Sequence, residues 1–263
     1  MAEDILLRED LGPVTRLTMN SPGALNPLSD AMLEKLKTTF SDLMAESAQR
    51  VVILRGAGKA FCAGHDLKEL RAKRAAPDKG AAELRELFTR CSEVMQMIPR
   101  MPQPVIAEVH GIAAAAGCQL VAACDMAVAA DDTRFGVNGV NIGLFCSTPM
   151  VALSRNIPRK SAFEMLTTGR FVLANRAMEL GLINKAVNAV RLEEETMTLA
   201  TTVADKLGSA VRIGKRAFYE QLEMGLDAAY AHTGAAMVEN MLDQDTDEGI
   251  RAFLDKRPPQ WTQ

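Results

Sequence analysis

The segment VIAEVHGIAAAAGCQL, residues 105–120, decides the fold of this chain of 263 residues. Its first five residues are apolar apart from Glu108, and they predict a short strand that is buried on both faces. His110-Gly111 then predicts a turn, and the small residues that follow lead into a helix over residues 119–123. A buried strand, a glycine turn, small residues and a helix, in that order, favour an α/β fold.

The same order occurs earlier in the chain. Val51–Leu54 predicts another buried strand, Gly56-Ala57-Gly58 predicts a turn, and a helix begins at Asp66, whose side chain we expect to cap it. A helix start leaves backbone N–H groups unpaired, and these attract negative charge. Two such turns side by side would direct two amides at one oxygen atom, as in an oxyanion hole. Tight packing alone is the alternative reason for turns rich in Gly and Ala.

The remaining sequence extends the α/β alternation and then becomes helical. We expect one region over residues 1–194 and a helical C-terminal region over residues 195–263, whose apolar stripes pack either on another subunit or on the chain's own core. Further strands are expected over 14–19 and 126–129, and further helices from Ser29 or Asp30, over 83–97, near Pro149, and over 190–207, 211–226, 228–242 and 245–254.

Composition excludes several classes of function. With 30 basic and 33 acidic side chains the net charge is −3, so we expect no nucleic-acid partner. No apolar run reaches the ~20 residues of a membrane span, so we expect no membrane partner. The five cysteines include no CxxC pair and the three histidines are far apart, which indicates reduced thiols in a cytoplasmic protein and no metal site.

The ordered motifs make the chain resemble the crotonase (enoyl-CoA hydratase/isomerase) superfamily. The resemblance runs from about residue 12 to residue 257. It is carried by Leu17–Pro22, Leu25–Ser29, Phe61–Leu67, Pro104–Ala107, His110-Gly111, Gly117–Leu120, Ala123–Asp125, Gly143-Leu144, Thr168-Gly169, Ala177–Asn184 and Asp247–Leu254.

The resemblance implies a spiral of ββα repeats, a helical C-terminal region that forms a homotrimer or a hexamer, and binding of acyl-CoA or enoyl-CoA thioesters. It implies no bound cofactor, because coenzyme A enters as part of the substrate. The backbone amides of His65 and Ala116 correspond to the two donors that hold the thioester oxygen. Lys256 is expected at the nucleotide end of coenzyme A, unless it is only a solvated helix end. By the same resemblance, the channel for coenzyme A is expected to be lined by Gly23, Ala24, Leu25, Ala63, Asp66 and Leu67.

The sequence departs from the family where proton transfer is expected. Members that add water use two glutamates, and the corresponding positions here are Gln119 and Gly139. A glutamine amide does not titrate, so it can orient a water or a carbonyl but cannot carry a proton. Cys146 and Ser147 place a thiol and a hydroxyl near the expected acyl group, where Ser147 is predicted to act by hydrogen bonding.

Several interpretations of this polar group remain open. A nucleophilic Cys146 or Ser147 would need a base, for which the ring of His65 is the local candidate. Alternatively, Ser147 and Thr148 cap the helix near Pro149, and the ring of His65 only packs.

The sequence therefore predicts a crotonase-type enzyme that stabilises a thioester enolate, with enoyl-CoA hydratase as the expected activity. Double-bond isomerisation and thioester hydrolysis through non-standard residues are the alternative reactions. A protein that binds acyl-CoA without chemistry is a second class, favoured by Gln119 and Gly139. A purely structural trimer is the third.

Overall fold

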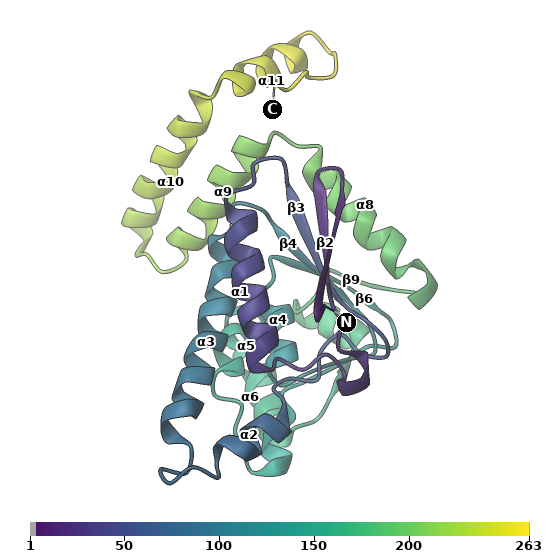
Figure 1. The fold of residues 1–263 in the computed structure, drawn as a ribbon. Helices are drawn as coiled ribbons and strands as arrows, with labels where there is room; N and C mark the ends of the chain where they lie inside the picture. Colours follow the sequence, from purple (N-terminus) through teal and green to yellow (C-terminus); the bar gives the residue numbers. More distant parts are fainter. Residues whose placement is uncertain (1–3, 263) are drawn as a thin grey trace.

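A computed structural model describes residues 4–262, in which helices surround two β-sheets (Figure 1). The larger sheet has six strands in the order β1-β2-β3-β4-β6-β9, and the smaller has three in the order β5-β7-β8. Only β1 and β2 pair antiparallel in the larger sheet, so its other strands form a parallel set. This arrangement confirms the α/β class expected from the sequence.

The strands are β1 (Leu6–Leu11), β2 (Val14–Met19), β3 (Val51–Gly56), β4 (Val105–Val109), β5 (Ile112–Ala114), β6 (Met126–Ala130), β7 (Arg134–Gly136), β8 (Val172–Leu173) and β9 (Lys185–Val187). The α-helices are α1 (Asp30–Met44), α2 (Leu67–Lys73), α3 (Ala81–Arg100), α4 (Ala116–Ala123), α5 (Pro149–Asn156), α6 (Arg159–Thr168), α7 (Ala174–Leu180), α8 (Leu192–Ala204), α9 (Gly208–Gln221), α10 (Leu226–Met241) and α11 (Gln244–Leu254). Three 3-10 helices are η1 (Pro22–Ala24), η2 (Asn138–Ile142) and η3 (Ala189–Arg191).

The two faces of the larger sheet are covered by different helices. Val52 and Leu54 of β3 pack in the main core with α1 and α3. Their neighbours Val51 and Ile53 point to the other face, where they pack against Ala200 of α8. Figure 1 shows α1 and α3 on one side of the sheet and α8 on the other. The apolar run Val51–Leu54 of β3 is therefore buried on both faces, as predicted.

The smaller sheet makes the fold repetitive. β4 of the larger sheet continues into β5 of the smaller sheet and then into α4, and β6 continues into β7 and then, through η2, into α5. After β3 the chain makes a single bridge to β5, through Cys62 and Ala113, before it enters α2. These are the ββα repeats expected of the spiral.

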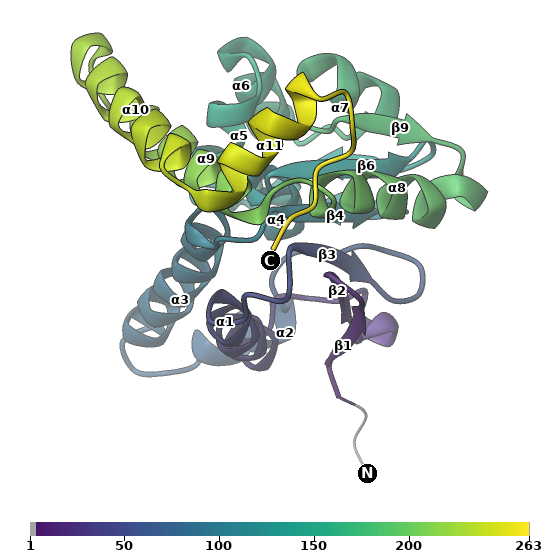
Figure 2. The ribbon, with the colours of Figure 1, turned by 90° about the horizontal axis from the view of Figure 1, so that it is seen from above.

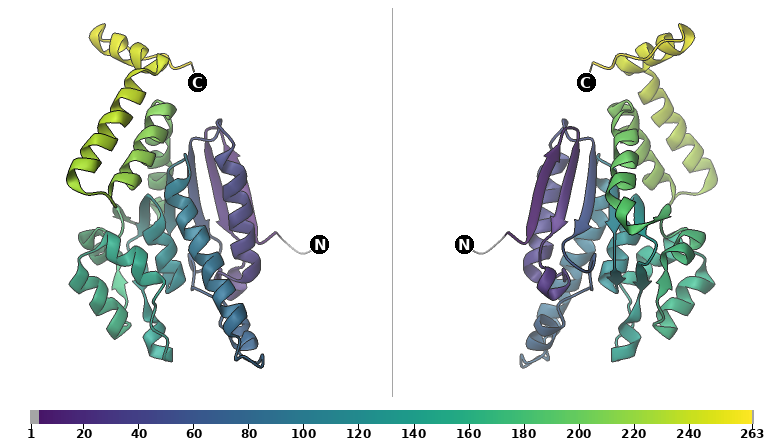
Figure 3. Two further views of the ribbon diagram at one scale, coloured as in Figure 1. Left: turned by 90° about the vertical axis from the view of Figure 1, so that its left-hand side faces the viewer. Right: turned by 90° about the vertical axis from the view of Figure 1, so that its right-hand side faces the viewer.

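The last two helices extend away from the sheets, as Figures 2 and 3 show for α10 and α11. The boundary predicted between residues 194 and 195 falls inside α8, a helix that packs on the sheet through Ala200 and Ala204. The projecting part is therefore shorter than residues 195–263, although the division into domains stays a prediction. Within residues 4–262, no helix has the length and apolar character needed to cross a membrane.

Candidate active site

The two predicted turns lie side by side. The amide of Phe61, after β3, donates to the carbonyl of His110, after β4, with N and O 3.0 Å apart. The amide of Ala114 donates to the carbonyl of Cys62, also at 3.0 Å, and Cys62 bridges in parallel to Ala113. Hydrogen bonding between the turns thus fixes their spacing.

Glycine allows the two turns to touch. A Cβ atom on Gly117 would lie 2.2 Å from the carbonyl oxygen of Cys62, so no side chain fits there without a shift of the backbone. Gly64 has a φ of +97°, and a Cβ atom on it would lie 3.4 Å from the amide nitrogen of Ala116. The start of α4 is therefore in contact with the turn that precedes α2.

The backbone amides of His65 and Ala116 are left unused by the fold. In the described part of the chain, neither donates a hydrogen bond, and Ala116 is the first residue of α4. Ala115, which precedes it, has a φ of 48° and a ψ of −115°, a conformation that non-glycine residues rarely adopt. Two contacting turns thus each present one free amide, which is what a pair of oxyanion donors requires.

The ring of His65 is held away from solvent. Its Nδ1 lies 3.1 Å from the carbonyl oxygen of Leu28, and its plane meets the ring of Phe88 edge-on at 5.6 Å. Burial lowers the pKa of this imidazole, which favours the neutral ring. With Nδ1–H donating to Leu28, the lone pair is on Nε2, which is buried and has no hydrogen-bond partner. No hydrogen bond joins this ring to Cys146 or Ser147, so the nucleophile–base pair considered from the sequence is not assembled.

Gln119 lies on α4, three residues after Ala116, and therefore on nearly the same side of that helix. It is only 4% exposed, and its Oε1 atom is buried without a partner. A buried amide oxygen that lacks a partner is costly, so this atom is expected to accept a hydrogen bond from a water or a ligand.

Gly139 lies in η2, where its backbone amide faces the thiol of Cys146. A Cβ atom on Gly139 would lie 2.3 Å from the carbonyl oxygen of Leu144 and 2.9 Å from the Sγ atom of Cys146. The present backbone therefore has no room for a side chain at this position. Burial raises the pKa of Cys146, so the thiol stays protonated and is a poor nucleophile.

Ser147 is exposed, and its hydroxyl donates only a long bond of 3.4 Å to the carbonyl of Phe145. The alternative that Ser147 and Thr148 cap α5 is wrong, because Thr148 is at the cap position without a side-chain hydrogen bond. Pro149, the first residue of α5, has no N–H group and removes one of the donors that a cap would satisfy.

The residues expected to line the coenzyme A channel come together at the first turn. The amide of Ala63 donates to the carbonyl of Leu25 at 3.0 Å, and the amide of Leu28 donates to Gly64 at 2.8 Å. Asp66 caps α2 as predicted, since its carboxylate accepts from the amides of Lys68 and Glu69. The residues of the set lie in η1 or directly after it (Gly23, Ala24, Leu25), in the turn before α2 (Ala63) and at the start of α2 (Asp66, Leu67).

Sequence reasoning missed Asn26, which holds this loop in place. It is fully buried, and its side chain accepts from the amide of Ser21 at 2.9 Å and donates to the carbonyls of Ala57 and Ala60 at 2.8 Å each. Its φ of 50° is a conformation that asparagine tolerates better than most residues. An asparagine between an apolar residue and a proline was the signal for such a turn.

Comparison with known proteins places this geometry in a family. The sequence model described as enoyl-CoA hydratase/isomerase matches residues 10–263. The chain belongs to the enoyl-CoA hydratase/isomerase family.

Relatives in this family match along nearly the whole chain. The chain is 43% identical over 261 residues to enoyl-CoA hydratase domain-containing protein 3, mitochondrial, of Danio rerio, covering 99% of this chain and 89% of the relative. The human protein of the same name is 45% identical, covering 96% and 82%. A crystal structure titled enoyl-CoA hydratase of Mycobacterium smegmatis is 51% identical with a TM-score of 0.95, covering 99% and 100%. Similarity at this level confirms the crotonase fold that the resemblance implied.

Lys256 lies far from the two turns within the same chain. It follows α11 with a φ of 56°, and Figure 1 shows α11 at the opposite end of the molecule from α2. Any role at the nucleotide end of coenzyme A therefore requires a neighbouring copy of the chain.

A wide groove, lined on one side by α9 and α10, leads to Gln119. It has a volume of about 1560 Å³ and runs over α4 between α3 and α5. Within residues 4–262, no cluster of three or more His, Cys, Asp or Glu side chains is placed to hold a metal ion.

Proposed function

We propose that this enoyl-CoA hydratase/isomerase family member acts on an enoyl-CoA or acyl-CoA thioester and stabilises its enolate, with hydration of the double bond as its activity. The observation that supports this is the pair of unused amides at His65 and Ala116 on two turns in contact. An enolate carries its negative charge on the thioester oxygen. One donor aimed at such an oxygen from about 2.7–3.1 Å is worth roughly 2.7–4 kcal/mol in the transition state.

In this proposal Gln119 orients the water or the carbonyl through its buried amide. Because an amide does not titrate, Gln119 cannot take up the proton of the water, and hydration would proceed without the two glutamates of the family's water-adding members. The water oxygen would bond to the β carbon, and the proton that this water gives up would pass to the α carbon. Double-bond isomerisation and thioester hydrolysis need the same enolate or oxyanion stabilisation and are the alternative reactions. Ser147 would contribute a hydrogen bond only.

The remaining parts of the proposal concern binding and assembly. The channel would be lined by the loop of Gly23 and the start of α2, with Gly139 and Cys146 beside the acyl group and Lys256 supplied by a neighbouring copy. That neighbour implies a homotrimer or a hexamer. Coenzyme A enters with the substrate, and no bound cofactor is proposed. A cytoplasmic location is supported by five free, buried cysteines.

The test is a steady-state assay with crotonyl-CoA and longer enoyl-CoAs. We expect turnover above buffer for the wild type. In Gln119→Leu we expect kcat to fall by about tenfold, because the oriented water or carbonyl loses one hydrogen bond. In Gln119→Glu we expect hydration to rise, since one acid–base group contributes about 10²–10⁴-fold. Gln221→Leu, on α9, is the matched control and should behave as wild type. Wild type that turns over no thioester would contradict an enzymatic function.

A second candidate function is binding of acyl-CoA without chemistry. The observation that favours it is Gly139, where contacts with Leu144 and Cys146 leave no room for a catalytic side chain. Calorimetric binding of an acyl-CoA whose thioester stays intact after prolonged incubation would support this candidate. Failure of acyl-CoA to raise the melting temperature would exclude both candidates and favour a structural trimer.

A further inference from the structure

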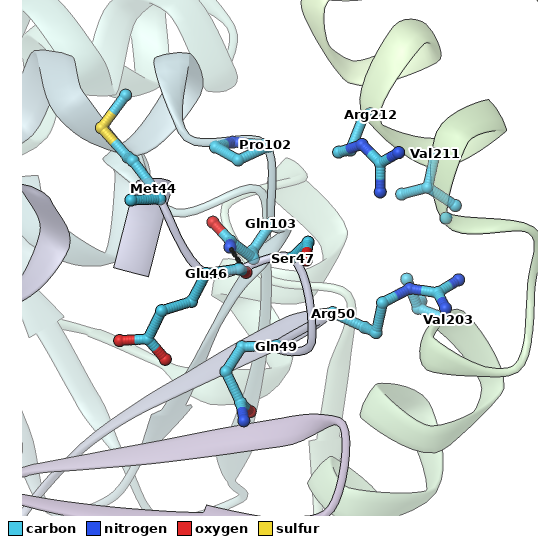
Figure 4. A pocket seen from close by; sticks show the side chains of 12 residues that line it. Met44, Glu46, Ser47, Gln49, Arg50, Pro102, Gln103, Val203, Val211 and Arg212 are labelled. Atoms are coloured by element: carbon cyan, nitrogen blue, oxygen red, sulfur yellow. Dashed lines mark hydrogen bonds between the residues drawn. The ribbon is translucent and has the colours of Figure 1, made fainter. Parts of the chain in front are cut away.

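A second cavity lies at the other end of the larger sheet. Its volume is about 290 Å³, and it is enclosed by the loops before β3 and β4 and by the start of α9 (Figure 4). Because β3 begins at Val51 and β4 begins at Val105, this cavity is at the amino ends of the parallel strands. The two turns of the candidate active site follow the carboxyl ends of the same strands. The cavity is therefore at the opposite end of the sheet from the two turns, although Pro102 and Arg212 also line the groove that leads to Gln119.

Two arginines line this cavity without a carboxylate partner. Among residues 4–262, the Arg50 guanidinium donates one hydrogen bond, to the carbonyl of Lys206, which leaves most of its five donors without a partner in that part of the chain. Arg212 of α9 makes no hydrogen bond or ion pair in the described part of the chain. The two charges are close enough that Arg212, together with burial, lowers the pKa of Arg50.

The start of α9 adds a third positive element. A Cβ atom on Gly208, the first residue of this 14-residue helix, would lie 2.5–2.6 Å from the Nε, Cζ and Nη2 atoms of Arg50. The guanidinium thus lies on the helix N-terminus, whose partial positive charge repels a cation. Arg50, Arg212 and the helix start would all be stabilised by one anion between them.

No acidic side chain of the cavity neutralises these charges. Glu46 is the only acidic residue in its lining, and its carboxylate is engaged by Arg8 of β1, with one N–O distance of 2.8 Å. Figure 4 shows the Glu46 carboxylate turned away from Arg50 and Arg212. The cavity therefore keeps an excess of positive charge.

A buried acceptor also lines the cavity. Gln103 is 3% exposed and donates from its amide nitrogen to the carbonyls of Leu43 and Glu46, at 2.6 and 3.0 Å. Its Oε1 atom is buried without a partner. Figure 4 shows this oxygen on the side of Gln103 that faces away from the two arginines, so Gln103 forms part of the cavity wall and is not counted as a contact of the anion.

We propose that this cavity binds a phosphate-type oxyanion through Arg50 and Arg212. Guanidinium groups match the oxygen geometry of phosphate, and such charge-assisted hydrogen bonds are about twice as strong as neutral ones. The phosphate is either inorganic or part of a nucleotide. Such an oxyanion supplies the negative charge that would neutralise both guanidinium groups and the N-terminus of α9.

The test is binding of inorganic phosphate to the full chain, measured by calorimetry and by melting temperature against sodium chloride of equal ionic strength. We expect the wild type to bind phosphate, and Arg212→Gln and Arg50→Gln to bind it about tenfold more weakly or worse. Arg212 has no hydrogen-bond or ion-pair partner within residues 4–262, so Arg212→Gln should melt like wild type in buffer without phosphate.

Two matched controls locate the phosphate. Arg85→Gln removes an exposed arginine of α3 and the same charge, and Lys256→Gln changes the predicted nucleotide end of coenzyme A. Both should bind phosphate as wild type does. The proposal is overturned if wild type binds phosphate no better than chloride, if Arg212→Gln retains full affinity, or if either control loses it equally.

A further arm identifies the source of the phosphate. Arg212 also lines the groove that leads to Gln119, so Arg50→Gln is the variant for this arm. If Arg50→Gln also weakens binding of 3′,5′-ADP, the cavity accepts a nucleotide-borne phosphate. If only inorganic phosphate is affected, the cavity takes the free ion. Either result supports the anion site, and neither depends on turnover of a thioester.

Discussion

Two glycines set what the candidate site can become. A side chain on Gly117 would collide with the carbonyl of Cys62, and one on Gly139 would collide with the carbonyl of Leu144. Glycine at 117 therefore lets the two turns touch, whereas glycine at 139 lets the thiol of Cys146 occupy the adjoining space. Substituting glutamate at 139 would force the loop to move rather than restore a catalytic acid, since contacts of 2.3 Å are well inside van der Waals distance.

The buried ring of His65 predicts a pH dependence of stability. Burial lowers the pKa of His65 below its ordinary value of 6.5. Just below pH 6.5 the imidazole is therefore protonated in the unfolded chain and still neutral in the folded chain. Stability is then fully present above about pH 6.5 and falls as the pH drops toward the folded pKa. We expect the melting temperature to decrease more steeply from pH 7 to pH 5 in wild type than in His65→Gln. Parallel curves would show that another group is responsible.

Much of the candidate site could be predicted because it is local in sequence. Glycine turns after apolar strands pointed to two donor amides, which the family resemblance assigned to His65 and Ala116, and the cap formed by Asp66 followed from its place before a helix. Contacts between distant segments could not be predicted. Asn26 holds its loop by donating to the carbonyl of Ala57, and the carbonyl of Leu144 leaves no room for a side chain at Gly139. Both carbonyls are more than four residues away in the chain, so no local sequence pattern reveals these contacts.

The element that ties the C-terminal region to the core is α9. Lys215 of α9 is buried, and its ammonium donates to the carbonyls of Ile98 and Gln103 at 2.8 Å and to Asp125 at 2.7 Å. The same carboxylate accepts from the hydroxyl of Tyr219, also at 2.7 Å. This buried pair therefore fixes α9 against the end of α3 and the turn after α4.

Removing one member of this pair should be strongly destabilising. In Lys215→Met the charge of Asp125 loses its buried partner, and breaking such a pair typically costs about 3–5 kcal/mol. Urea unfolding should show the loss, while Lys160→Met, an exposed lysine of α6, should stay near wild type. The double variant Lys215→Met with Asp125→Asn should recover part of the stability. A loss below about 1 kcal/mol in Lys215→Met would contradict an anchoring role.

Elements with a strong periodic pattern were predicted, and short or polar ones were not. The strands at Val51 and Val105 and the helices of the last third follow from apolar runs and stripes. β1 was missed because the strand is at the edge of the sheet and exposes most of its charged residues. β5, β7, β8 and β9 have two or three residues each, too few to show a period.

At the scale of the whole molecule, the C-terminal helices carry apolar side chains that the single chain does not cover. Leu242 is 81% exposed and Phe253 is 82% exposed. A monomer rarely leaves so many large apolar groups in water, so this surface is expected to be an interface. The exposed apolar residues of α10, α11 and the turn between them are Leu226, Tyr230, Met237, Val238, Met241, Leu242, Ile250, Phe253 and Leu254.

We expect light scattering to give about three or six times the chain mass of 28.5 kDa. A charge placed at the interface, as in Phe253→Asp, should shift the protein toward monomer. Val190→Asp places the same charge on η3, at a residue that is 91% exposed, and should leave the assembly intact. Wild type that stays monomeric at micromolar concentration would remove the neighbour from which Lys256 is proposed to come.

That the two unused donors belong to the main chain has a practical consequence. An alanine scan would replace the imidazole of His65 yet keep its N–H, and at Ala116 it would change nothing. An alanine scan would therefore indicate that residues 65 and 116 are not needed, although their backbone amides would be untouched. Mapping the site requires changes to the peptide bond itself, such as ester substitution at each amide, because both proposed donors are backbone N–H groups that a side-chain substitution leaves in place.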